Sequence, residues 1–291
     1  MSTRNPSIGM EYSQNYLHSR RLVRRLLEKS SIRPGDLVYD IGAGHGIISQ
    51  ELARRGARVV AIEKDRELHS RLKRRLAGNP LVDIRLADFL KERLPSHGAY
   101  KVFANIPFLA TADIVRRLLW RENPPQDCYL IMQKEAADRF RGTPCETQFS
   151  VLSGPWFEFS LLHSFRRTDV VPSPGVDVVL MRMRKRGPPL LASEHTGAYR
   201  DFVIYAFRQG SPSLKKTLAG TLTDTQFRRL SADLRFGLQA RPSDLDVEQW
   251  LALFRFFATK VDERRRRSLL GARRILSRQQ SHLRERHRAG R

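Results

Sequence analysis

Cysteine is scarce in this sequence, and its scarcity excludes two kinds of site. The chain has two cysteines among 291 residues, Cys128 and Cys145. Two thiols cannot make a disulfide framework, and neither belongs to the C-x-x-C pair that is typical of zinc or redox sites. Cys128 lies in an apolar run and is expected in the core, whereas Cys145 is expected in a loop.

Long hydrophobic runs are lacking as well. No stretch reaches the roughly 18 apolar residues of a membrane-spanning helix, and the first residues, MSTRNPSIGMEYSQNY, lack the apolar segment of a secretory signal. We therefore expect a cytoplasmic protein that makes no membrane contact. The hydrophobic share of 41% over 291 residues suffices for one large folded domain with a smaller appendage.

Acidic residues are few relative to basic ones: 30 Asp and Glu stand against 53 Lys and Arg, a net charge of +23. Such a charge attracts polyanions, of which nucleic acid is the commonest, and no amphipathic anchor favours the alternative of an acidic membrane. Residues 261–291 hold 11 Arg against 3 acids, while the other 260 residues still carry +15. We interpret the tail, 262–291, as a partly helical, mobile RNA-binding extension; a tail that only aids solubility is the alternative.

Strand and helix patterns alternate along the first half of the chain, which indicates a parallel α/β sheet with helices on both faces. Strands are predicted at 36–44, 57–63, 82–88, 100–107 and 127–133, and helices at 19–30, 47–56, 66–77, 111–121 and 134–140. Later strands are predicted at 149–165 and 177–184, a linker at 187–197, and helices at 199–209, 223–234 and 246–260. Thr223 or Asp224, and Asp244, are predicted helix N-caps.

A glycine-rich turn, Asp40 to Gly46, joins the first predicted strand to its helix. Its sequence, DIGAGHG, has the glycine spacing G-x-G-x-G, which is shorter than the G-x-G-x-x-G of dinucleotide sites. Preceded by an acidic residue, it is the pattern of S-adenosylmethionine-binding methyltransferases, where glycines let a ligand approach the backbone N–H groups. A turn that merely packs tightly is the alternative, and His45 is expected to be an exposed turn residue.

Polar side chains end four neighbouring strands of the predicted sheet: Asp40, Glu63, Asp88 and Asn105. Because the carboxyl ends of parallel strands face one crevice, we expect these side chains to converge. A carboxylate at Glu63 suits the two hydroxyls of a ribose. Asp88 suits the amino group of an adenine, with the Phe89 N–H on the ring. One such acid would be interpreted as a surface cap, but three acids and an amide in register indicate a nucleoside cofactor.

The stretch Asn105-Ile106-Pro107-Phe108 follows at the end of a buried strand. An adenine amine is a poor nucleophile because its lone pair is delocalised into the ring. Acceptors at the Asn105 side-chain oxygen and at the carbonyl of Ile106 or Pro107 would favour a tetrahedral nitrogen, and Pro107 donates no N–H. Phe108 would stack on an extruded base. No general base is strictly required, because the amine becomes acidic as it is methylated.

Several motifs in order resemble the Erm family of 23S rRNA adenine-N6 methyltransferases, which confer macrolide-lincosamide-streptogramin B resistance. They are QNYL (14–17), DIGAGHG (40–46), Glu63, ADF (87–89), NIPFLATADIVRRLL (105–119), QKEAADRF (133–140), TQFSVL (147–152) and VPSPGVDVVLMRM (171–183). The resemblance runs from about residue 10 to 260. The related KsgA/Dim1 rRNA adenine dimethyltransferases of the small subunit usually read N-L-P-Y, so the Ile-Pro-Phe spelling is more similar to Erm.

The resemblance implies methyl transfer from S-adenosylmethionine, without a metal, to one adenine in the domain V hairpin of 23S rRNA, by a monomer. It implies catalytic roles for Asn105, Ile106, Pro107 and Phe108. It implies that the cofactor is bound by Gln14, Asn15, Leu17, Asp40, Gly42, Gly44, Gly46, Glu63, Lys64, Asp88, Phe89 and Asn105. The sequence departs from the family at Val170, where an aromatic side chain is common.

We therefore predict a Rossmann-like catalytic domain at 1–190, a small helical RNA-binding domain at 191–261 and the tail at 262–291. Two alternatives to the 23S rRNA assignment stay open. One is a KsgA-type enzyme acting on 16S rRNA. The other is a non-catalytic nucleic-acid-binding descendant of the fold, against which the whole set of Gly42, Glu63, Asp88 and Asn105 argues.

Overall fold

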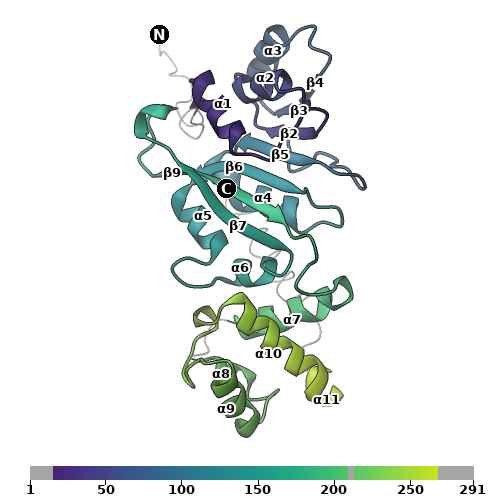
Figure 1. Ribbon diagram of the computed structural model, residues 1–291, viewed down its shortest axis with the longest axis vertical. Coiled ribbons are helices and arrows are strands. Elements are labelled where there is room, and N and C mark those ends of the chain that lie inside the picture. Colours follow the sequence, from purple (N-terminus) through teal and green to yellow (C-terminus); the bar gives the residue numbers. More distant parts are fainter. Residues whose placement is uncertain (1–15, 209–212, 268–291) are drawn as a thin grey trace, which may run out of the picture. The chain divides into compact units, whose positions relative to one another are not determined.

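A computed structural model describes residues 16–208 and 213–267 (Figure 1). Gln14, Asn15 and the tail from 268 onward therefore lie outside the described residues. The chain divides into two compact units that interleave in sequence. The first unit comprises residues up to 138 and 158–185, and the second comprises 139–157 and the residues from 186 onward. The predicted division at residues 190 and 261 stays a prediction.

The first unit is built on a seven-stranded sheet with the order β4-β3-β2-β5-β6-β9-β7 (Figure 1). The strands are β2 (Leu37–Ile41), β3 (Arg58–Glu63), β4 (Val82–Leu86), β5 (Lys101–Asn105), β6 (Asp127–Gln133), β7 (Phe157–Ser164) and β9 (Val178–Lys185). Strands β2 to β6 pair in parallel, and β9 runs antiparallel to β6. The predicted Rossmann-like α/β fold is confirmed.

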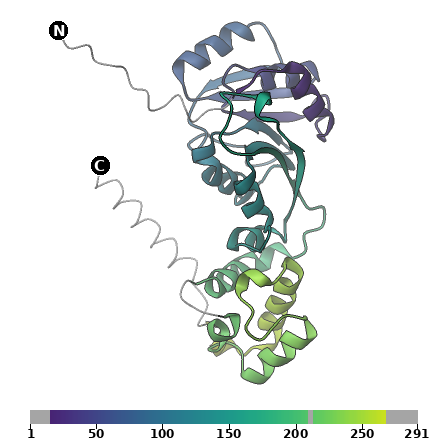
Figure 2. The ribbon, with the colours of Figure 1, turned by 90° about the vertical axis from the view of Figure 1, so that its left-hand side faces the viewer.

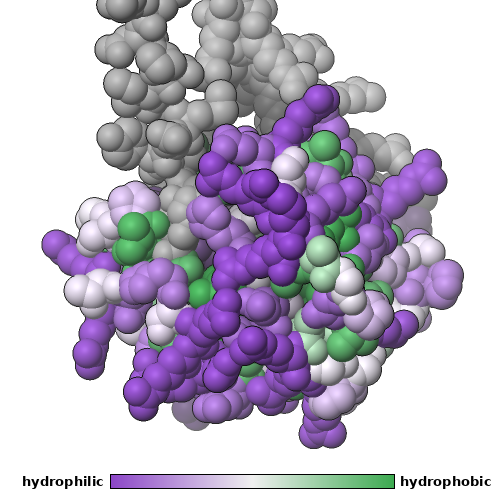
Figure 3. All heavy atoms as spheres, turned by 90° about the horizontal axis from the view of Figure 1, so that it is seen from above, coloured by the Kyte–Doolittle hydropathy of each residue, from purple (hydrophilic) through white to green (hydrophobic). Residues whose placement is uncertain are grey.

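Helices cover both faces of this sheet (Figures 1 and 2). They are α1 (Arg20–Glu28), α2 (Ile47–Arg54), α3 (Arg66–Arg75), α4 (Thr111–Leu119) and α5 (Lys134–Arg141). The apolar stripe of α1, which includes Leu22 and Leu26, packs with α2, α3 and strand residues such as Phe103 in one core cluster. The opposite stripe of α1 exposes arginines. Figure 3 views the molecule from the end where α1 to α3 lie in Figure 1, and this face is mostly hydrophilic.

Parallel pairing places the predicted strand ends at one edge of the sheet. Asp40 of β2 pairs with Ala61 of β3, which lies two residues before Glu63. Glu63 pairs with Leu86 at the end of β4, just before Asp88. The short strands β1 (Tyr16–Leu17) and β8 (Val170–Val171) form a separate antiparallel pair.

The second unit is helical, with α6 (Gln148–Ser153), α7 (Thr196–Ala206), α8 (Leu214–Leu218), α9 (Asp224–Asp233), α10 (Val247–Lys260) and α11 (Glu263–Arg267). Aromatic side chains dominate its core: Phe202 stacks on Phe257 with ring centroids 4.8 Å apart, and Trp250 is fully buried. In the part of the chain that the structure describes, no helix is long and apolar enough to span a membrane.

Two sequence-based predictions in this unit are wrong. Residues 149–153, predicted as strand, belong to α6, because Thr147 and Ser150 form a capping box that starts a helix. A short apolar run of this kind is compatible with the repeat of a strand or of a helix, so the capping residues decide which of the two forms. The N-cap of α10 is Asp246, whose side chain accepts the N–H of Gln249 at 2.8 Å; Asp244 instead ends a single 3-10 turn, Pro242–Asp244. Thr223 caps α9 as predicted.

Candidate active site

Backbone N–H groups of the glycine-rich turn after β2 form hydrogen bonds to β3. The N–H groups of Gly42 and Ala43 donate to the carbonyl of Ile62 at 2.8 and 3.0 Å. The N–H of Gly44 donates to Oε2 of Glu63 at 2.8 Å. These amides therefore hold the end of β3 and orient Glu63, which is a different use from the direct ligand contact that the sequence suggested for the turn.

Two glycines of the turn lie close to side chains of different elements. Gly46 has φ of +76°, and a Cβ there would come within 2.3 Å of the Leu72 side chain of α3, so this glycine permits close packing of α2 on α3. Gly42 has φ of +69°, and a Cβ there would lie 3.7 Å from Cδ of Pro107. The turn thus approaches the Asn105–Phe108 stretch at Gly42.

Asp40 is fully buried beneath the turn. Its Oδ2 accepts the hydroxyl of Ser49 at 2.6 Å, whereas its Oδ1 has no hydrogen-bond partner among the described residues. Burial raises the pKa of this carboxyl to about 7, and the hydrogen bond from Ser49 lowers it only in part. Asp40 does not line the pocket described below, so it supports the turn from inside the fold.

Glu63 is buried too, but its two oxygens are directed by backbone amides on either side. Oε2 accepts the N–H of Gly44, and Oε1 accepts the N–H of Asp65 at 2.9 Å. Each carboxylate oxygen keeps a second acceptor position. The side chain is therefore fixed in orientation and still able to accept the hydroxyls of a ligand.

A pocket of about 150 Å³ lies at this edge of the sheet. It gathers six of the predicted site residues: Gly42, Glu63, Lys64, Asp88, Phe89 and Pro107. Its other walls, none of them a predicted site residue, are apolar: Ile41, Ile62, Ala87, Leu90, Ala110 and Ile114. The missed residues adjoin predicted ones along the chain, a signal that would have found Ile41, Ile62, Ala87 and Leu90.

Buried apolar residues and exposed polar residues both line this pocket. Phe89 is buried, with the guanidinium of Arg117 5.9 Å from its ring centroid. Asp88 is exposed, and its Oδ1 accepts the N–H of Leu90 at 2.9 Å. A mostly apolar pocket with carboxylates at Glu63 and Asp88 matches the chemistry of an adenosine, which has an aromatic base, an amino group and two ribose hydroxyls.

The Asn105–Phe108 stretch runs from the end of β5 into a 3-10 turn, Phe108–Ala110. Asn105 is half-buried. The carbonyl of Pro107 already accepts the N–H of Ala110 at 3.0 Å and the hydroxyl of Thr111 at 3.3 Å. The sequence predicted that the carbonyl of either Ile106 or Pro107 accepts a hydrogen of the adenine amine. The carbonyl of Ile106 is the one of the two that those turn hydrogen bonds do not occupy.

Phe108 packs, half-buried, against the core cluster that contains Leu17 and Val170. These two residues are Cα partners in the β1-β8 pair, and both are buried, at 5% and 2% exposure. Val170 therefore fills core space at this position and presents no ring to a base. Seven predicted site residues do not line the 150 Å³ pocket itself: Leu17, Asp40, Gly44, Gly46, Asn105, Ile106 and Phe108.

Comparison with known proteins agrees with this geometry. The family profile described as "Ribosomal RNA adenine dimethylase" matches residues 6–259. A curated "rRNA adenine N-6-methyltransferase" of Bacillus licheniformis is 26% identical over 244 residues, 83% of this chain and 84% of the relative. A "Ribosomal RNA small subunit methyltransferase A" of Thermotoga neapolitana is 29% identical over 253 residues, 86% of this chain and 91% of the relative.

A solved structure shows the same fold. The crystal structure of the 23S rRNA methyltransferase ErmE superposes with a TM-score of 0.77 at 26% identity, covering 84% of this chain and 100% of that one.

Proposed function

The chain belongs to the ribosomal RNA adenine dimethylase family, and from this premise we propose that it methylates N6 of one adenine in the macrolide-binding region of 23S rRNA. The observation that carries the proposal is the shared wall of the pocket. Pro107 lines the same pocket as Glu63 and Asp88, so the stretch that would present an adenine borders the pocket that would hold the nucleoside part of the cofactor.

S-adenosylmethionine is the cofactor of this family, and when bound it supplies an electrophilic methyl group on a sulfonium. The residues present fit its adenosine part. Glu63, fixed by two backbone amides, would accept the ribose hydroxyls, Asp88 the adenine amino group, and Phe89 would contact the ring. Lys64 would flank the ribose. Gln14 and Asn15, assigned to the methionine end by resemblance, lie outside the described residues.

Asn105 and Ile106 would bind the target base. The side-chain oxygen of Asn105 and the carbonyl of Ile106 would each accept one hydrogen of the adenine amine, which aims the nitrogen lone pair at the methyl donor. Phe108 would stack on the base from one side, and Val170, which is aliphatic and buried, gives no second aromatic face. Asp40 has no solvent-accessible surface and so does not act as a base; the proton leaves to solvent as the amine becomes acidic.

A 16S rRNA target is the second candidate, since the small-subunit methyltransferase of Thermotoga neapolitana is as similar in sequence. The Ile-Pro-Phe spelling at 106–108 favours 23S rRNA. We further propose that the protein acts as a monomer in the cytoplasm, where ribosomes are, and that methylation gives macrolide-lincosamide-streptogramin B resistance.

Mass spectrometry of rRNA fragments from cells expressing the protein tests the proposal, because it reports base, position and methyl count together. We expect one modified adenine in 23S rRNA and a higher tolerance to macrolides. Asn105→Ala should remove the modification while RNA affinity stays near wild type, because the amide acts on the amine and contributes little to RNA binding. Methylation confined to 16S rRNA, or an active Asn105→Ala protein, would contradict the respective assignments.

A further inference from the structure

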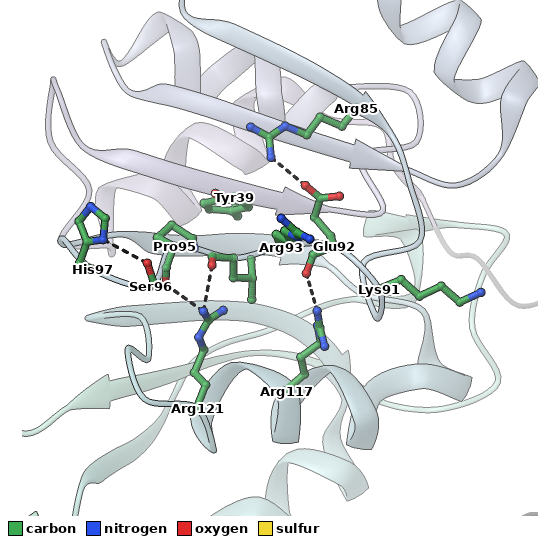
Figure 4. A pocket seen from close by; sticks show the side chains of 11 residues that line it. Tyr39, Arg85, Lys91, Glu92, Arg93, Pro95, Ser96, His97, Arg117 and Arg121 are labelled. Carbon is green, nitrogen blue, oxygen red and sulfur yellow. Dashed lines mark hydrogen bonds and ion pairs between the residues drawn. The ribbon is translucent and has the colours of Figure 1, made fainter.

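A second pocket, of about 780 Å³, lies in the first unit beside α4 (Figure 4). Its walls come from the loop 91–97 that follows Phe89, from Tyr39 and Arg85 of the sheet, and from Arg117 and Arg121. It borders the 150 Å³ pocket along two segments, because Leu90 and Ile114 line that pocket while Lys91 and Arg117 line this one.

Positive charge dominates the lining. Five basic side chains, Arg85, Lys91, Arg93, Arg117 and Arg121, face one acid, Glu92. That acid is engaged by Arg85, whose Nη1 lies 2.8 Å from Glu92 Oε1. Arg85 also pairs with Asp83, so the uncompensated charge comes from the other four basic side chains. A concave surface with an excess of one sign of charge focuses its field on the space inside, so the pocket attracts anions.

Three of the guanidinium groups are held in place. Arg121 donates to the carbonyls of Leu94 and Pro95 at 3.0 and 2.9 Å, and Arg117 donates to the carbonyl of Glu92 (Figure 4). The buried Nε atoms of Arg117 and Arg121 have no acceptor among the described residues. Side chains fixed in this way lose little rotamer freedom when they bind an anion.

Lys91 and Arg93 complete the pocket from its exposed loop. Neither side chain forms an ion pair or hydrogen bond with another residue in the described part of the chain. Lys91 extends outward from the loop (Figure 4), and the two unpaired cations can each contact a separate phosphate oxygen at the rim of the pocket. Of the two rings in the lining, Tyr39 is buried at 3% exposure and His97 is exposed, so the lining offers mainly charge. It therefore suits a nucleic-acid backbone better than a base.

We propose that this pocket binds phosphodiester groups of the RNA strand next to the target adenine, an inference that rests on the proposed function. Helix α4 begins directly after the Asn105–Phe108 stretch, and with a rise of about 1.5 Å per residue Arg117 lies about 9 Å along the axis from Thr111. Phosphates flanking a base held at Phe108 are thus within reach of α4 and the loop 91–97.

The test compares two double variants that remove equal charge. Lys91→Gln with Arg93→Gln alters the pocket; Lys73→Gln with Arg74→Gln alters exposed residues of α3 as the matched control. Affinity for a synthetic 23S rRNA hairpin carrying the target adenine and its flanking strands is measured as a function of salt. Because a lost phosphate contact lowers the log–log slope by about 0.7, the pocket variant should lose about 1.4 and the control less than half of that.

A pocket variant with the wild-type slope, or with the same loss as the control, overturns the proposal. Methyl transfer to the same hairpin by the wild-type protein is followed in parallel. No transfer would refute the proposed function, whereas transfer with an unchanged slope would refute only the phosphate site. Both pairs of side chains are exposed, so equal unfolding temperatures of the three proteins confirm that the fold is kept.

Discussion

Asp40→Asn should make the protein more stable at alkaline pH and leave it unchanged in acid. Asp40 is fully buried, its Oδ1 lacks a partner among the described residues, and its pKa is about 7 instead of the ordinary 3.8. Asparagine has nearly the same shape and can still accept the hydroxyl of Ser49, but it never ionises. The substitution therefore removes the ionisation of the buried group and little else.

The sign follows from proton binding in the two states. Between about pH 4 and 7 the native carboxyl holds a proton that the unfolded chain has released, so stability falls as pH rises through this window. Above pH 7 the full difference of about 3 pKa units is present. At about 1.4 kcal/mol per unit it amounts to about 4 kcal/mol. We expect the Asp40→Asn variant to exceed wild type by up to this amount at pH 8, and the two stabilities to converge near pH 4.

Urea unfolding of both proteins without cofactor, from pH 4.5 to 8.5, measures the difference. Comparing them at each pH cancels the titration of every other group. Ser49→Ala is the control: it removes the hydrogen bond that lowers the pKa of Asp40, so its loss of stability should continue to higher pH than that of wild type and be larger in total. A stability difference between the Asp40→Asn variant and wild type that does not vary with pH would refute the reasoning.

Three further outcomes are expected. Gly46→Ala should lower the free energy of unfolding by about 2–4 kcal/mol, because backbone strain at positive φ and a clash with the Leu72 side chain add together. Gly35→Ala, at φ of +85° with open space around it, should show the backbone strain alone, and an equal loss of stability in both variants would contradict the clash. Arg182→Leu should cost about 3 kcal/mol in the same assay, since it strips the bidentate partner from buried Asp127; a neutral effect would show that the pair adds nothing. Deleting 262–291 should lower the salt slope of RNA binding by about 0.7 to 0.9 per lost phosphate contact, and an unchanged slope would mean that the tail is only solvated.

The sequence predicted the sheet and the cofactor edge because both depend on repeated local signals. Apolar runs ending in Asp40, Glu63 and Asn105 define strands whose carboxyl ends must meet once the sheet is parallel. What it could not predict is the use of the turn amides. Whether the Gly44 N–H meets a ligand or the Glu63 carboxylate depends on distances of tenths of an ångström, which no spacing encodes.

The basic pocket beside α4 was missed for a related reason. Its arginines are spread over a strand, a loop and a helix, and in the sequence they do not stand out among 53 basic residues. The anchors that hold Arg117 and Arg121 are backbone carbonyls of the loop 91–97, whose positions depend on the folded loop. Side-chain identity alone therefore carried no signal for this site.

The interleaving of the two units limits how the protein can be taken apart. Residues 139–157 precede β7 and β9 in the chain, yet Val151 and Leu152 are buried in the core of the helical unit, and Tyr199 donates its hydroxyl to the carbonyl of Val151 at 3.0 Å. A stop codon after residue 185 would leave those apolar side chains without their cover. Exchange of the helical unit between relatives would therefore require two transplanted segments, and a catalytic fragment made by simple truncation would be prone to aggregate.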